Sequence, residues 1–107
     1  MPLYLVHHLP LTHFVCVFFF WHFDQFAGMH TLAHIEAFVD DVVLVSESDL
    51  IEAARACFES GLVVEASGAA AVAALRSGAV RSEDYRSVVG VVSGRNVTLD
   101  DLAELLA

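Results

Sequence analysis

The chain contains no lysine, because the five residues counted as lysine or arginine are all arginine. Chemistry that begins with a lysine amine, such as Schiff-base formation, is therefore excluded for this chain on its own. The five arginines stand against 14 aspartates and glutamates, which gives a formal net charge of −9. Because phosphate backbones are bound by clustered lysine and arginine, we expect no nucleic-acid partner.

Cysteine is scarce as well, since only Cys16 and Cys57 occur in 107 residues. This number predicts neither a disulfide framework nor a metal knuckle, and it favours a reducing, cytoplasmic location. Cys57 falls on the apolar face of a predicted helix with no histidine or asparagine partner placed beside it. We therefore interpret it as a packing residue rather than a nucleophile.

Apolar residues make up 57% of the chain, and the excess is concentrated in residues 3–26. A membrane-spanning helix needs roughly 20 mainly apolar residues in a row, whereas this run is interrupted by His7, His8, Pro10, His13 and His22. A secretory signal begins with positive charge, and no arginine precedes Arg55. We expect no membrane span, and a membrane-anchored domain is the least favoured of the alternatives considered.

The composition changes near residues 29–32, where Phe- and His-rich sequence gives way to amphipathic patterns with charged residues. We predict a boundary there, with a leader over residues 1–31 and one domain over residues 32–107. The leader has neither helical nor strand periodicity, and its Phe, Val, Cys and Leu have pyrimidine-rich codons. We interpret it as sequence of doubtful origin, such as intronic sequence read as protein.

From residue 32 onward the pattern predicts helix, strand, helix, helix, strand and helix. Ser46 with Asp49, and Thr98 with Asp101, have the spacing of capping boxes that begin the second and the last helix. Ser67 is expected to cap the third helix. The segments are 32–38, 42–45, 46–61, 67–78, 88–92 and 98–106.

Both predicted strands are continuous apolar runs, which are typical of strands buried on both faces of a parallel sheet. Strands joined through helices predict an α/β architecture with right-handed crossovers. Two strands alone bury too little to be stable. We therefore expect a partial open parallel sheet with flanking helices, cut from a larger fold.

Two short motifs in this domain could carry chemistry. Ser93 and Gly94 follow the second strand, where loops of an open α/β sheet form a ligand crevice. A serine hydroxyl there can donate to a heterocyclic nitrogen, and glycine lets backbone approach a flat ring. Glu65 precedes a Gly/Ala-rich helix start. Simpler interpretations of both motifs stay open. Ser93 and Gly94 could form a tight strand-to-helix turn, and Glu65 could be a carboxylate favoured by a helix dipole.

The order and separation of these motifs resemble the threonine and serine dehydratase family, which also includes serine racemase. Family members show Glu-Pro-Ser-Gly-Ala-Ala before an alanine-rich helix and Ser-Gly-Gly-Asn-Val at a later strand end. Here Ala66 stands in place of the proline and Arg95 in place of the second glycine. Residues 38–47, with an aspartate pair before a strand, also resemble the family. The similarity covers about residues 37–106.

The resemblance implies the tryptophan synthase β-like fold of pyridoxal-phosphate (PLP) enzymes, known as fold type II, and an ammonia-lyase that converts L-threonine or L-serine to a 2-oxo acid and ammonia. It implies that Ser93 hydrogen-bonds the PLP pyridine nitrogen, that Gly94 lies beside the ring, and that Glu65 lines the cofactor edge. The lysine, the substrate-carboxylate loop and the phosphate cradle of the family have no counterpart in this sequence. No catalytic residue and no metal ligand is therefore assigned.

The histidines do not change this interpretation. His30 and His34 have the i, i+4 spacing of paired metal ligands, but no third ligand is placed, and we interpret the spacing as coincidence.

The leading prediction is a fragment of a PLP-dependent lyase of amino-acid metabolism, inactive alone, whose complete form takes an amino-acid substrate. The alternative is a non-catalytic interaction or regulatory fragment that docks on a full-length relative through an unpaired sheet edge. Association with itself, a preference for threonine or serine, and dehydratase or racemase activity stay open. We expect no carboxy-terminal effector domain.

Overall fold

The computed structural model describes residues 3–9, 14–18 and 29–107, with side chains for residues 29–30 and 32–107. The rest of the predicted leader lies outside the described residues. The elements are strands β1 Leu3–Leu9, β2 Phe14–Phe18, β3 Asp41–Leu44 and β4 Ser87–Gly90, helices α1 Met29–Phe38, α2 Glu47–Glu59, α3 Ala70–Arg76 and α4 Leu99–Leu106, and 3-10 turns η1 Ala66–Ala69 and η2 Ser82–Asp84. From residue 29 on, the order of helices and strands confirms the order expected from sequence.

The four strands form one sheet in the order β3-β2-β1-β4. Strand β2 pairs in parallel with β3, with Val15 opposite Asp41. Strand β1 pairs antiparallel with β2 and with β4. The sheet is therefore mixed, which differs from the all-parallel arrangement expected, because the two central strands come from residues 3–18. Strands β3 and β4 still point the same way.

The central position of β1 and β2 bears on the predicted boundary at residue 31. These strands supply every partner of β3 and β4 within the described residues, so the pairing of the sheet crosses that boundary. The expectation that neighbouring strands are missing rested on counting two strands alone. The interpretation of the leader as sequence of doubtful origin stays a prediction.

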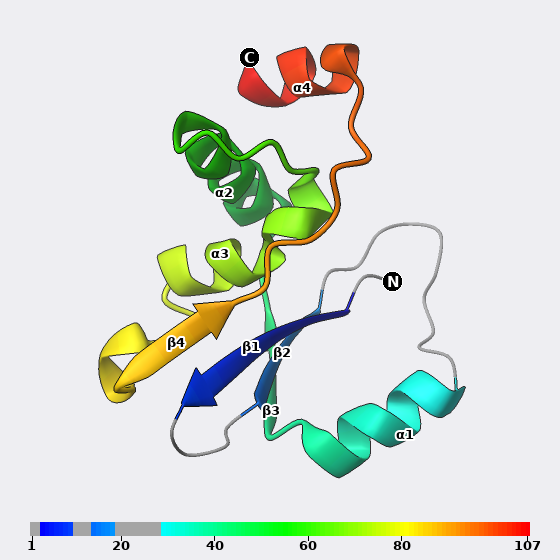
Figure 1. Cartoon of the computed structure of the whole chain (residues 1–107), viewed down its shortest axis with the longest axis vertical. Helices are drawn as coiled ribbons and strands as arrows, with labels where there is room; N and C mark the ends of the chain where they lie inside the picture. The colour runs from blue at the N-terminus through cyan, green and yellow to red at the C-terminus, as the bar shows by residue number, and fades with distance from the viewer. Residues whose placement is uncertain (1–2, 10–13, 19–28) are drawn as a thin grey trace.

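Helices α2 and α3 lie on one side of this sheet. Figure 1 shows α3 between the sheet and α2, with α4 and α1 at opposite ends of the molecule. The core consists mainly of small residues, namely Ala53, Ala54, Ala69, Ala70, Ala71, Ala73 and Ala74, around the fully buried Leu50. Alanine faces let the backbones of α2 and α3 approach closely. The core is consequently thin, and Leu50 is its one large side chain that is fully buried among the described residues.

The strands themselves are less buried than expected. The prediction of fully buried strands is wrong for β3 and β4, since Val42 is 40%, Leu44 64% and Val89 48% exposed. Val43 and Val88, which alternate with them, pack against the core. There are two physical reasons. Strands β3 and β4 are the two edges of the sheet, and Val42, Leu44 and Val89 point to the side opposite the core formed with α2 and α3.

The predicted helix ends can be compared one by one. Both capping boxes are confirmed. The side chains of Ser46 and Thr98 each accept a hydrogen bond from the backbone N–H three residues on, and the aspartate at that position accepts one from the backbone N–H of the cap residue. Gly61 and Gly78 end their helices with φ of +86° and +80°, as expected of left-handed glycine caps. The predicted Ser67 cap is wrong. Helix α3 begins through η1, and no side-chain cap hydrogen bond forms at either start.

Within residues 29–107, no helix is long and apolar enough to cross a membrane.

Candidate functional site

The segments that hold Glu65 and Ser93 lie side by side and are joined by backbone hydrogen bonds. The Glu65 N–H donates to the Gly94 carbonyl at 3.1 Å, and the Ser93 N–H donates to the Gly68 carbonyl at 3.2 Å. A third bond, from the Gly68 N–H to the Glu65 carbonyl at 2.9 Å, closes the turn between them. We call residues 65–68 and 93–94 the clamp. It brings together all three residues that the sequence assigned to a cofactor edge.

Two glycines make this close approach sterically possible. Gly68 is buried, and a Cβ there would overlap the Ser93 carbonyl oxygen and lie 2.9 Å from the Gly94 carbonyl oxygen. Gly94 has φ of +82°, and a Cβ on it would overlap the Glu65 carboxylate oxygen and lie 2.9 Å from its Cδ. The Glu65 side chain therefore lies directly against the Gly94 backbone. Packing against backbone therefore requires glycine at position 68, whereas at position 94 the positive φ requires it.

Ser93 has a side-chain hydroxyl that the contacts within the clamp do not use. Its backbone N–H is used in the clamp, but its hydroxyl has no hydrogen-bond partner among residues 29–107. The residue is half-buried, in the extended segment that runs from β4 past α3 to α4 (Figure 1). A half-buried hydroxyl without a protein partner can donate to an acceptor on a ligand. Arg95, which departs from the family motif, is exposed.

Glu65 occupies the N-cap position of η1, with φ −71° and ψ 158°, and makes no side-chain cap hydrogen bond. The simpler interpretation predicted a carboxylate near a helix N-terminus, and Glu65 does lie at the start of η1. Since its carboxylate fills the space beside the Gly94 Cα, that side of the glycine is closed to a flat ring.

These residues fit one edge of PLP and do not fit the whole cofactor. The Ser93 hydroxyl is a suitable donor for a pyridine nitrogen. The sequence contains no lysine to hold the cofactor covalently, and it has no glycine-rich cradle of the family type for the phosphate. No catalytic step through PLP can therefore be assigned to this chain alone.

A groove of about 430 Å³ lies between α2 and α4 and reaches Ala66 of the clamp. Its lining combines apolar and charged residues, namely Glu47, Leu50, Ile51, Arg55, Ala66, Asp101, Glu104, Leu105 and Ala107. The Arg55 guanidinium bridges the two helices by donating to the Leu105 carbonyl at 3.3 Å. Neither Ser93 nor Gly94 lines this groove. Sequence reasoning missed it, although the apolar faces of the two helices were visible.

One carboxylate of this groove, that of Asp101, belongs to the capping box of α4. The Asp101 carboxylate accepts from the Thr98 hydroxyl at 2.6 Å and from the Thr98 backbone N–H at 3.0 Å. These hydrogen bonds from Thr98 lower the pKa of Asp101 below its usual value. The carboxylate is therefore ionised at neutral pH, at the first turn of α4, where negative charge is favourable.

The remaining chemically reactive side chains are accounted for by local contacts. His34 Nδ1 lies 2.7 Å from the His30 backbone carbonyl, so that ring nitrogen is engaged within α1. In the part of the chain that the structure describes, no group of three or more metal-ligating side chains is present. Cys57 is buried in the core, and burial raises the pKa of its thiol. The interpretation of Cys57 as a packing residue is confirmed by its position.

No protein-family model and no curated protein matches the chain.

Proposed function

We propose that this chain is a segment of a PLP-dependent threonine or serine dehydratase-like protein that keeps the loop for the cofactor's ring nitrogen and does not catalyse alone. The observation that supports the proposal is the clamp. It joins the segment before η1, which holds Glu65, to the segment after β4, which holds Ser93 and Gly94, through backbone hydrogen bonds. Without a lysine, the chain has no side-chain amine from which the covalent chemistry of the family starts.

The family resemblance suggests a role for each clamp residue. When bound, PLP supplies the electron sink for elimination, and the Ser93 hydroxyl donates to its ring nitrogen. Because a neutral hydroxyl is a weak acid, this donor leaves the ring nitrogen largely unprotonated. Gly94 would bring the backbone close to the ring, and the Glu65 side chain lies against that glycine.

The test uses pyridoxine 5′-phosphate, which has no aldehyde and so cannot react with the amino terminus. Its binding to the purified chain is measured by equilibrium dialysis. Loss of one hydrogen bond, worth about 1 kcal/mol, should weaken binding by Ser93→Ala about fivefold. Ser60→Ala, which removes an exposed hydroxyl at the end of α2, is the matched control and should bind as the unaltered chain does.

Two results would overturn the proposal. Equal affinity of the Ser93→Ala and Ser60→Ala variants would show that the Ser93 hydroxyl does not contact the ring. Release of ammonia from L-threonine or L-serine by the purified chain with PLP would refute the claim that it is inactive alone.

A second candidate function is a non-catalytic fragment that docks on a full-length dehydratase. The observation that favours it is the exposed edge strand β3, with Val42 and Leu44 open to solvent. An open edge offers unpaired backbone groups to another strand. Co-expression with a tagged full-length threonine dehydratase should recover the chain in the affinity eluate. Recovery no greater than that of an untagged control would count against it.

A further inference from the structure

The sheet has two open edges that can pair with each other. Strands β3 and β4 are its outermost strands, and no other strand in the described ranges pairs with their outer sides. Since β3 is parallel to β2, and β1 is antiparallel to both β2 and β4, the two edge strands run in the same direction. A second copy, shifted sideways in the same orientation, would thus set its β4 parallel to β3.

The exposed apolar side chains of both edges lie on one face. Val43 of β3 and Val88 of β4 pack toward the helices, so their exposed neighbours Val42, Leu44 and Val89 lie on the opposite face. Side chains alternate along a strand. A sheet continued from one copy to the next would therefore continue this apolar face, and α2 and α3 of both copies would lie on the other side.

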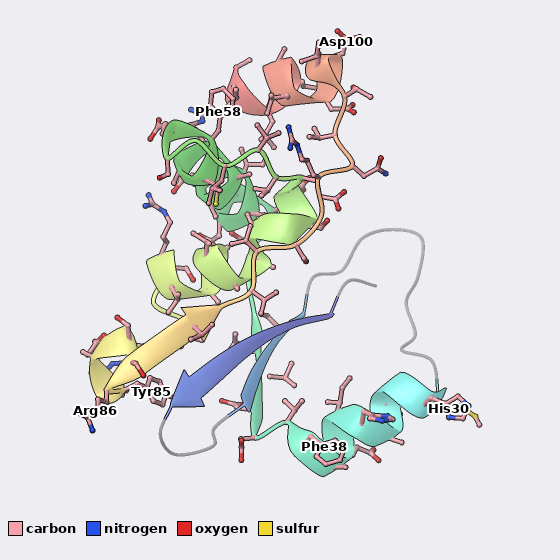
Figure 2. The ribbon with its side chains drawn as sticks, in the orientation of Figure 1. His30, Phe38, Phe58, Tyr85, Arg86 and Asp100 are labelled. Carbon is pink, nitrogen blue, oxygen red and sulfur yellow. The ribbon has the colours of Figure 1, made fainter. Side chains whose placement is uncertain are left out.

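Charge distinguishes this pairing from the others that the edges permit. Asp41 is the first residue of β3, and Arg86 immediately precedes β4; both are exposed. Arg86 forms no salt bridge within residues 29–107, and Figure 2 shows it at the start of β4, directed away from the sheet. In parallel pairing the two strand starts lie side by side, about 4.8 Å apart. Antiparallel pairing of β3 with β3, or of β4 with β4, brings no such opposite charges together.

We propose that copies of this chain associate head to tail, with β3 of one copy pairing in parallel with β4 of the next and Asp41 facing Arg86. This interface is heterologous, so it builds open chains of copies rather than a closed two-fold dimer. It does not require cofactor binding and stands apart from the proposed function. The net charge of −9 opposes it, because copies of like charge repel one another.

The test is sedimentation velocity over a concentration series at about 0.15 M salt, where screening acts beyond about 8 Å. The expected result is association that grows with concentration beyond the dimer. Reversing one charge, in Asp41→Arg or Arg86→Glu, replaces an attraction with a repulsion. Each variant should weaken association roughly tenfold. Glu59→Arg, at the exposed end of α2, is the matched control and should associate as the unaltered chain does.

Mixing the two reversed variants gives the decisive measurement. In an equimolar mixture, Asp41 of one variant faces Arg86 of the other, and the two introduced charges also face each other. Association should therefore return to the level of the unaltered chain, and circular dichroism should show that all variants stay folded. A monodisperse monomer at every concentration would overturn the proposal. A mixture that associates no better than its components would overturn it too.

Discussion

The substitution Gly68→Ala tests the clamp most directly. The added Cβ would overlap the Ser93 carbonyl oxygen, and a second carbonyl, that of Gly94, lies 2.9 Å away. Both obstacles are backbone atoms, so they cannot rotate aside as a side chain could. We expect the two segments to separate, which breaks the hydrogen bonds from Glu65 to Gly94 and from Ser93 to Gly68. Two backbone hydrogen bonds contribute about 1–3 kcal/mol together, and overpacking costs about 1–3 kcal/mol more.

The expected loss of about 2–6 kcal/mol is a large part of the roughly 5–15 kcal/mol by which a domain is stable. The free energy of unfolding is measured by urea titration, followed by circular dichroism. Gly90→Ala is the matched control, because a Cβ there meets Ala71 Cβ at 3.5 Å, an ordinary contact. It should change stability by less than about 1 kcal/mol. If both variants unfold at the same urea concentration, the close approach of residues 68 and 93 does not exist in solution.

Three further predictions follow from other parts of the structure. The hydrogen bonds from Thr98 lower the pKa of Asp101, so their contribution to α4 is present above the unfolded pKa of about 4 and is lost as pH falls through the folded value. Helical circular dichroism should therefore fall on acidification, and Thr98→Ala should flatten that change. In a Cys16→Ser background, Cys57 should react with a thiol reagent far more slowly when folded than in urea, because burial raises its pKa; equal rates would contradict its burial. A chain that begins at Met29 lacks the two central strands and should show no cooperative unfolding, whereas a sharp transition would show that the domain folds without them.

The helix ends could be predicted because they depend on residues three or four positions apart. The boxes at Ser46 and Thr98 close within one turn, and the turns at Gly61 and Gly78 require only a residue that adopts positive φ. The Ser67 cap failed for a related reason. The carbonyl of Glu65 takes the Gly68 N–H instead, and this 3-10 turn starts the helix without a side-chain cap.

The sheet could not be predicted in the same way, because strand pairing joins residues far apart in the sequence. Val6 pairs with Gly90 and Val15 with Asp41, and nothing in the local pattern of residues 3–18 indicated a partner. The apolar runs at 42–45 and 88–92 were correctly assigned to strands, yet their burial was overestimated. A short apolar run fits a central or an edge strand, so its exposure depends on the order of the strands and on which face the helices cover.

The clamp also shows how far a motif can indicate activity when the lysine is missing. Gly68 is required by its contact with the Ser93 and Gly94 backbone, and Gly94 is required by its positive φ. The fold therefore explains both glycines, whether or not a cofactor binds. The Ser93 hydroxyl has no such explanation, because it makes no hydrogen bond within residues 29–107. The stability of Ser93→Ala should consequently match that of the unaltered chain, and any loss of ligand binding in this variant measures function rather than folding.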